Sequence, residues 1–254
     1  MKSCQPYGAA FYESLERGSE ASARAILPLI LDLVGPRSVV DVGCGDGSWL
    51  RVLGESGVDD LLGLDGPWIS RSALKISEQS FDPIDLRQAF PVPRRFDLAI
   101  SLEVAEHLPP DSAVDFVERL TALAPVVLFS AAIPHQGGTE HLNEQWADHW
   151  ATLFGRSGYA VLDVVRPAFW VHGGVEPWYA QNAFLYASPE ALAENDRLAQ
   201  KAAEGLSMPW RVVHPVLLER AVSIGHLTLG DHLRALPRAT RTALFRRHLW
   251  GAAR

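Results

Sequence analysis

The sequence predicts an α/β fold: a seven-stranded, mostly parallel sheet with helices on both faces and helical additions at both ends. Three observations favour it. Short apolar runs alternate with segments of helical periodicity between residues 36 and 188. The first run ends in three glycines at every second position, Gly43, Gly45 and Gly47. The last two runs have no clear helical segment between them, so we expect an antiparallel pair at one edge of the sheet.

The expected elements follow one another along the chain. Residues 1–35 form a helical lead-in, in which Pro28 predicts a kink or a break. Strands are expected at 39–42, 61–66, 81–86, 96–102, 125–130, 159–165 and 183–187, and helices at 48–55, 70–76, 109–123, 144–157 and 191–204. The chain therefore divides into the lead-in, a main domain at 36–188 and a helical extension at 189–254.

Composition narrows the class of protein. A net charge of -7 argues against a general nucleic-acid binder. The tail at 233–254 carries six arginines and no acidic residue, so it either contacts an acidic partner or membrane surface or is a solvated terminus. Two cysteines make no disulfide framework, and no run is apolar and long enough for a membrane span or a secretion signal. We therefore expect a cytoplasmic protein.

The glycine turn indicates which ligand the fold binds. A phosphate loop would need a Lys-Ser or Lys-Thr pair after the glycines, and the dinucleotide fingerprint would need a glycine at Ser48. Instead, Asp41 and Asp46 flank the turn. Carboxylates disfavour a pyrophosphate and suit a cofactor that carries a positive charge and free hydroxyls.

With three later stretches in the same order, this turn resembles the motifs of class I S-adenosylmethionine-dependent methyltransferases over residues 35–187. The resemblance implies a Rossmann-like methyltransferase fold, with S-adenosylmethionine as cofactor. A dehydrogenase of related fold, or a degenerate fold without cofactor, is the alternative. The segment from Glu103 to Leu108 matches the family's frequent E-x-x-E-H-L ending.

The resemblance also assigns residues to parts of the cofactor. Asp65 would accept the ribose hydroxyls, Asp85 would lie beside the adenine, and residues 102–104 would line the methionine part. The complete set is Asp41, Gly43, Gly45, Asp46, Gly47, Asp65, Gly66, Asp85, Leu86, Leu102, Glu103, Val104 and His107. Two alternatives stay open: Asp46 caps the following helix, and Asp82 replaces Asp85 at the adenine.

The acceptor side is expected in two segments. A polar loop at 133–146 follows the fifth strand, where ligands bind in open α/β sheets, and an aromatic cluster lies at 169–182. Both resemble segments of a bacterial methyltransferase subgroup found with polysaccharide or natural-product genes. The expected substrate contacts are His135, Gln136, Asn143, Trp146, Trp170, Trp178 and Tyr179. Core packing is the alternative for the aromatic residues.

Methylation of an oxygen requires that its proton be removed, and histidine is the usual base near neutral pH. His141 is the leading candidate because Asn143 and Glu144 could orient it; His135 comes next, and His107 third. Acidic residues and histidines cluster in the polar loop, but their spacing matches no strong zinc signature, so no metal is expected.

The sequence thus predicts O-methylation of a small molecule, a sugar or a natural-product intermediate, with a histidine base. The alternatives are N-methylation of a small amine, methylation of a peptide or protein docked on the C-terminal helices, and a non-catalytic cofactor-binding protein. A homodimer through the C-terminal helices is a further expectation. The acceptor, the choice among the histidines, the need for a divalent metal and the oligomeric state stay open.

Overall fold

A computed structural model describes residues 9–88, 90 and 94–222, with side chains from residue 18 onward. The chain forms two compact units, Met1–His214 and Pro215–Arg254. The described part of the second unit is helix α9 (Pro215–Val222). The basic tail at 233–254 lies outside the described residues, and the domain boundaries expected at 36 and 189 stay predictions.

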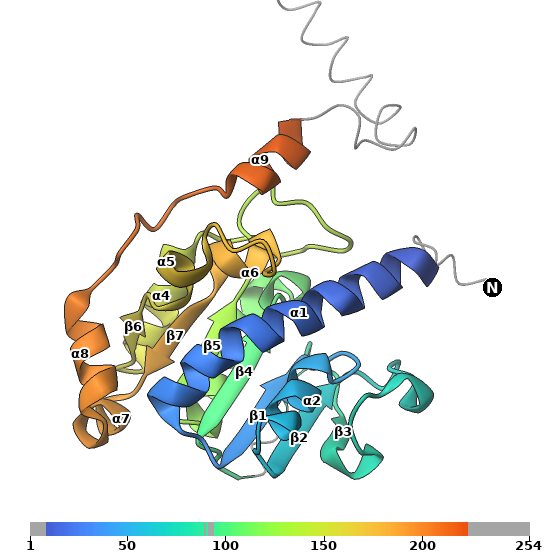
Figure 1. The fold of residues 1–254 in the computed structure, drawn as a ribbon, viewed down its shortest axis with the longest axis horizontal. Coiled ribbons are helices and arrows are strands. Elements are labelled where there is room, and N and C mark those ends of the chain that lie inside the picture. The colour runs from blue at the N-terminus through green and yellow to red at the C-terminus, as the bar shows by residue number, and fades with distance from the viewer. Residues whose placement is uncertain (1–8, 89, 91–93, 223–254) are drawn as a thin grey trace, which may run out of the picture. The chain divides into compact units, whose positions relative to one another are not determined.

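The first unit is built on one seven-stranded sheet with the order β3-β2-β1-β4-β5-β7-β6 (Figure 1). The strands are β1 (Ser38–Val42), β2 (Asp60–Asp65), β3 (Phe81–Pro83), β4 (Leu98–Leu102), β5 (Val126–Ser130), β6 (Ala160–Leu162) and β7 (Phe184–Ala187). Strands β1 to β5 pair in parallel, whereas β7 is antiparallel to both β5 and β6. The predicted sheet, with its antiparallel pair at one edge, is confirmed.

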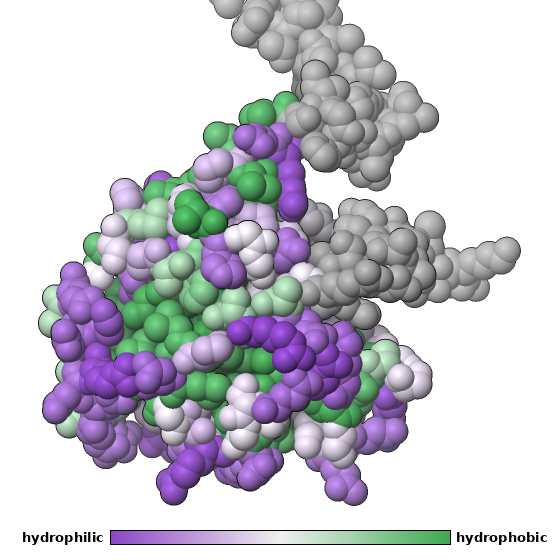
Figure 2. Space-filling view, viewed as in Figure 1, coloured by the Kyte–Doolittle hydropathy of each residue, from purple (hydrophilic) through white to green (hydrophobic). Residues whose placement is uncertain are grey.

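Helices cover both faces of this sheet. They are α1 (Ala9–Val34), α2 (Ser48–Glu55), α3 (Ala113–Leu123), α4 (Ala147–Arg156), α5 (Val165–Phe169), α6 (Pro177–Asn182), α7 (Pro189–Glu194) and α8 (Asp196–Glu204). Because strand side chains alternate, Val39 packs with the core under α1, α2 and α8, and Val40 with the core under α3 and α4. Figure 1 shows α1 crossing the near face of the sheet. Figure 2 shows hydrophilic residues over α7 and α8 and where α1 meets α2.

Several local predictions differ from the structure. The strand expected at 159–165 spans only Ala160–Leu162, and the helix expected at 191–204 is two helices, α7 and α8, because the Asn195 side chain caps the start of α8. Of the kink or break expected at Pro28, the break does not occur: helix α1 continues through Pro28, because the buried Leu27 and Ile30 hold both sides of it in the core. The helix expected at 70–76 is only the 3₁₀ turn η1 (Arg71–Ala73), and the Lys75 backbone N–H donates to the Asp46 carbonyl at 2.8 Å instead of extending it. Two short helices, α5 and α6, lie between β6 and β7, where none was expected.

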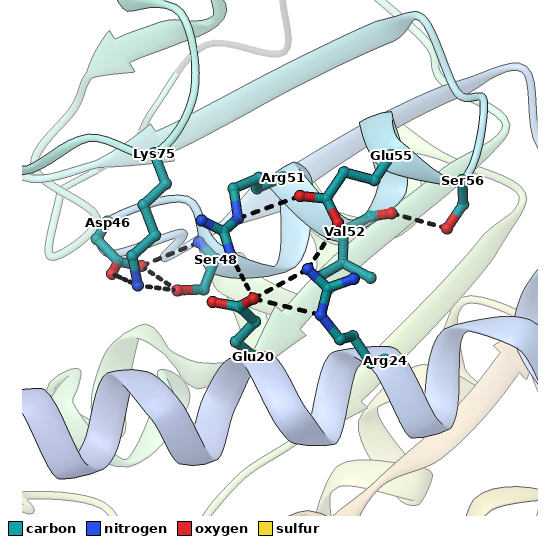
Figure 3. Close-up of polar contacts among 9 residues, drawn as sticks. All are labelled: Glu20, Arg24, Asp46, Ser48, Arg51, Val52, Glu55, Ser56 and Lys75. Atoms are coloured by element: carbon teal, nitrogen blue, oxygen red, sulfur yellow. Dashed lines mark hydrogen bonds and ion pairs between the residues drawn. The ribbon is translucent and has the colours of Figure 1, made fainter.

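Charged residues join α1 to α2 beside the glycine turn (Figure 3). Glu20 on α1 accepts from Arg24 on its own helix and forms an ion pair with Arg51 on α2. Arg24 in turn reaches Glu55 at 2.6 Å. Exposed ion pairs of this kind stabilise little individually, but the network fixes how α1 crosses α2.

A buried ion pair fastens the segment after α8 to the edge of the sheet. Arg166 is fully buried and donates to both Asp163 oxygens, at 2.8 and 2.6 Å. Two more of its N–H groups donate to the carbonyls of Met208 and Pro209, and its guanidinium lies 4.3 Å from the ring centre of Phe184. The buried guanidinium thus has a carboxylate, two carbonyl oxygens and an aromatic ring as partners, and a buried charge requires such partners.

Candidate active site

A pocket of about 580 Å³ opens at the carboxyl ends of β1, β2 and β4. Seven lining residues are among those that the sequence assigns to the cofactor: Gly43, Asp65, Asp85, Leu86, Glu103, Val104 and His107. The other five lining residues are not among those that the sequence assigns to the cofactor: Trp68, Arg87, Leu108, Glu140 and Leu142. The pocket thus lies where open α/β sheets bind ligands, and it has the size of a small-molecule site.

The glycine turn forms one wall of the pocket. Gly43, Gly45 and Gly47 all have positive φ, of 87°, 54° and 81°, a conformation that glycine adopts without strain. An added Cβ at Gly43 would lie 2.3 Å from Val104, so the turn and the segment after β4 touch only because that Cβ is missing. At Gly45 an added Cβ would meet no atom within 4 Å, so the turn borders open space there.

Asp65 ends β2 beside this turn. Its carboxylate accepts from the backbone N–H groups of Gly45 at 2.7 Å and Gly66 at 2.5 Å, which fixes its orientation. Burial raises the pKa of Asp65, and these two hydrogen bonds act in the opposite direction. The side chain is therefore held at the pocket wall as a preoriented acceptor.

Asp41 and Asp46 do not line the pocket. Asp41 is 3% exposed, and burial, followed by the charges of Asp65 and Asp46, raises its pKa to about 8. Asp46 Oδ1 accepts from the Ser48 backbone N–H at 2.9 Å and from its hydroxyl at 2.7 Å, and Lys75 Nζ lies 2.6 Å from Oδ2 (Figure 3). Asp46 therefore holds the first residue of α2, Ser48, although the N-cap position of the helix is Gly47.

The side of the pocket next to β3 is formed by charged and aromatic groups. Asp85 accepts from Arg87 through two guanidinium nitrogens, both at 2.8 Å, and this pairing lowers the pKa of Asp85. Arg87 lies 5.3 Å from the ring centre of Trp68, which is 61% exposed. Asp82 lies on β3 and does not line the pocket.

Glu103 is the centre of a partly buried amide network. It has a φ of 56°, and its carboxylate accepts from Gln136 Nε2 at 2.9 Å and from Asn182 Nδ2 at 3.1 Å. Asn182 and Gln181 both donate to Gln136 Oε1, at 2.8 and 3.2 Å. The network joins the segment after β4, the loop after β5 and α6. The sequence contained a signal for it, because Gln181 and Asn182 end the segment at 169–182 that resembles the methyltransferase subgroup.

Two of the three candidate histidines meet. The rings of His107 and His141 lie 4.8 Å apart at their centres, edge to face, and His141 Nδ1 lies 2.9 Å from Glu144 Oε1. Burial, followed by the nearby His141, lowers the pKa of His107. The exposed His135 does not line the pocket, but its backbone N–H donates to the other Glu144 oxygen at 2.8 Å.

The remaining residues expected at the substrate lie outside the pocket lining. Asn143 is buried and accepts from Gln145, and Trp146 has Arg211 at 5.9 Å from its ring centre. Tyr179 is buried against Trp49, with ring centres 5.3 Å apart. Trp170 packs on His214, and Trp178 packs on Tyr179. The other predicted cofactor residues also lie outside the pocket lining: Gly45 and Gly47 in the glycine turn, Gly66 directly after β2, and Leu102 at the end of β4.

Comparisons with known proteins agree with this arrangement. A family model described as a methyltransferase domain matches residues 15–169, and no curated protein sequence matches the chain. The methyltransferase domain of bacterial CtHen1 is 18% identical, with 66% of this chain and 97% of that chain covered and a TM-score of 0.51. DesVI of Streptomyces venezuelae is 16% identical, with 70% and 95% covered and a TM-score of 0.52. At such identities the two structures show a common fold.

None of the helices within the described residues is long and apolar enough to cross a bilayer. The family match spans well over half of the chain, and the fold, the glycine turn and the carboxylate at the end of β2 are those that the motifs predict. The chain belongs to the methyltransferase domain family, and it is an S-adenosylmethionine-dependent methyltransferase.

Proposed function

We propose that this enzyme methylates an oxygen atom of a small molecule, a sugar or a natural-product intermediate. One observation carries the proposal: His107, a lining residue, lies edge to face with His141, beside the pocket wall formed by Glu103 and Val104. The sequence assigns those two residues to the methionine part of the cofactor. A neutral hydroxyl is a poor nucleophile, so groups that can withdraw its proton belong next to the methyl group.

The pocket fits the cofactor on three points. It borders open space at Gly45, it presents the oriented carboxylate of Asp65 at the end of β2, and it is large enough for a nucleoside with an amino-acid side arm. Asp65 would accept the ribose hydroxyls, and Trp68 and Leu86 would contact the adenine. When bound, S-adenosylmethionine supplies a methyl group that passes from its sulfonium sulfur to the acceptor as the C–S bond breaks, leaving a neutral thioether.

The chain itself must then orient the acceptor and take up its proton. Histidines can assist in two ways: one accepts the proton, or a pair holds a cation that lowers the pKa of the hydroxyl. The sequence favours His141 as the base, and the Glu144 contact at 2.9 Å would orient it for that role. His135, exposed and outside the pocket lining, has less support as a base.

The finer aspects of the function stay predictions. They are a biosynthetic role in natural-product or polysaccharide pathways, a cytoplasmic location, the absence of nucleic-acid partners and a homodimer through the C-terminal helices. N-methylation and peptide methylation are the competing reactions. Product analysis separates them, because an O-methyl ether, an N-methylamine and a methylated peptide differ in the mass and the NMR shift of the new methyl group.

The cofactor assignment is tested with two aspartates at opposite ends of β2. Asp65→Asn should weaken binding of S-adenosylmethionine, measured by isothermal titration, about 10- to 100-fold, the usual value of a hydrogen bond to a charged group. Asp60→Asn is the matched control, because Asp60 begins the same strand, is exposed and pairs with Arg94. Equal affinities for the two variants, or no binding by the wild type, would contradict the assignment.

The reaction class is tested by incubating the enzyme with S-adenosylmethionine and a panel of sugars, phenols and small amines, and measuring the demethylated cofactor. We expect turnover with hydroxyl acceptors and O-methyl products. Turnover restricted to amines, or to a peptide library, would replace the proposal with the corresponding competing reaction.

A further inference from the structure

Three potential metal ligands come together beside the pocket. One ligand atom from each of Glu106, His107 and His141 lies within 4.8 Å of the others. The first two residues belong to the 3₁₀ turn η3 (Ala105–His107) after β4, and the third comes from the loop after β5. The sequence did not predict this group, because the two segments are 34 residues apart.

Glu106 provides an independent observation. Its side chain is 1% exposed, and its Oε2 atom has no hydrogen-bond partner among the described residues. Burial raises the pKa of this carboxyl well above its usual range, and the charges of Glu103 and Glu144 raise it further. A buried acceptor without a partner is costly, so a bound cation would supply what this oxygen lacks.

His141 is oriented as metal-binding histidines are. Its Nδ1 contacts Glu144 Oε1 at 2.9 Å, which leaves Nε2 as the ring atom available to a ligand. Glu144 is itself held, because its second oxygen accepts from the His135 backbone N–H at 2.8 Å. A carboxylate behind the ring fixes the tautomer and the direction of a metal-binding imidazole.

The two segments that carry the ligands are joined by backbone hydrogen bonds. The N–H groups of Leu142 and Asn143 both donate to the Glu106 carbonyl, at 2.7 and 2.9 Å. The position of His141 relative to Glu106 and His107 is therefore set by the fold. Glu103 lies close by, but its oxygens are taken by Gln136 and Asn182.

We propose that Glu106, His107 and His141 bind a divalent transition-metal ion at the acceptor side of the pocket. Two imidazoles and one carboxylate form a ligand set for zinc, iron(II), manganese or cobalt, and they suit magnesium less well. Three protein ligands leave coordination positions open, and His107 lines the pocket, so those positions face the acceptor.

The role of the ion rests on the proposed function. A cation at this place polarises an acceptor hydroxyl and lowers its pKa, which is the second of the two ways in which histidines can assist O-methylation. His107 and His141 then act as ligands, and Glu144 is a positioning residue for His141.

The test uses the full chain, treated with a chelator and then dialysed. Isothermal titration with zinc and cobalt(II) should give one equivalent per chain, and cobalt(II) should develop visible absorption bands of a site with nitrogen ligands. Glu106→Gln and His141→Ala should each weaken cobalt(II) binding at least about 10-fold, and Glu144→Gln about 10- to 100-fold. His172→Ala is the control, because His172 is exposed and outside the cluster.

Each outcome decides one question. Binding of less than one equivalent, or binding that His141→Ala leaves unchanged, would overturn the metal site. Glu106→Gln guards against misfolding, since it keeps the size and shape of the side chain, and circular dichroism with thermal unfolding reports that each variant is folded. If the metal binds in one equivalent but only amines are methylated, the metal site stands and the proposed O-methylation fails.

Discussion

Replacing Gly43 with alanine tests why a glycine must directly follow β1. Gly43 has a φ of 87°, and a left-handed conformation costs an L-residue about 1–2 kcal/mol. An added Cβ would also lie 2.3 Å from Cγ2 and 2.8 Å from Cγ1 of Val104, and overpacking of this kind costs about 1–3 kcal/mol. We therefore expect Gly43→Ala to lower the free energy of unfolding by about 2–5 kcal/mol.

A second substitution separates the two costs. Val104→Ala removes both Cγ atoms, and the nearest Val104 atom is then Cβ, at 3.1 Å from the added Cβ. Val104→Ala should therefore destabilise the wild type. In the Gly43→Ala background it should relieve the clash and recover about 1–3 kcal/mol of the lost free energy of unfolding. Urea denaturation of the four proteins without cofactor gives the coupling energy. A coupling energy below about 0.5 kcal/mol would refute the clash.

The control for this experiment is Gly45→Ala. Gly45 has a φ of 54°, but its added Cβ would meet no atom within 4 Å. Gly45→Ala should therefore lower the free energy of unfolding only by the conformational cost, about 1–2 kcal/mol. Val104→Ala should not compensate for this loss. Compensation by Val104→Ala in this background as well would show that the effect at Gly43 is not a local contact.

Two further predictions concern buried charges. Arg166→Met should lower the free energy of unfolding by about 3–5 kcal/mol, because the buried Asp163 carboxylate would lose its counter-ion and keep only the hydrogen bond from the Ser207 N–H. Adding Asp163→Asn should restore most of the loss in urea denaturation. No restoration would show that the carboxylate is not the cause. Burial raises the pKa of Asp41 from 3.8 to about 8, so its contribution to stability is fully present below about pH 4 and is lost as the pH rises through 8. In Asp41→Asn, the free energy of unfolding should no longer show this decline between pH 5 and pH 8. Parallel curves of the free energy of unfolding against pH for variant and wild type would contradict the prediction.

The parts of the site that could be predicted from the sequence are those fixed within one strand and the turn after it. Gly43 directly follows one apolar run, and Asp65 ends the next. The carboxyl ends of neighbouring parallel strands lie at one edge of a sheet. Their proximity therefore follows from the strand order alone. The same reasoning extends to Glu103 after β4, which pairs in parallel with β1.

The parts that could not be predicted depend on loops whose path the local pattern does not determine. Trp68 lines the pocket from a turn directly after β2, in which the Ile69 N–H donates to the Gly66 carbonyl at 3.1 Å, whereas the sequence indicated only a helix at 70–76. An aromatic side chain that packs in a core also has the same sequence signature as one that covers a ligand. Tyr179 could be either, and its contact with Trp49 places it in the core.

The loop after β5 and the segment after β4 form one structural unit, which decides how the chemistry of the site is assembled. Gln136 donates to the Glu103 carboxylate, and two backbone N–H groups of the loop donate to the Glu106 carbonyl. The loop that the sequence assigns to the acceptor therefore also orients the carboxylate assigned to the cofactor. The same contacts bring His141 to His107, so neither segment alone creates the paired histidines. Changes to the loop should consequently affect cofactor affinity as well as acceptor choice.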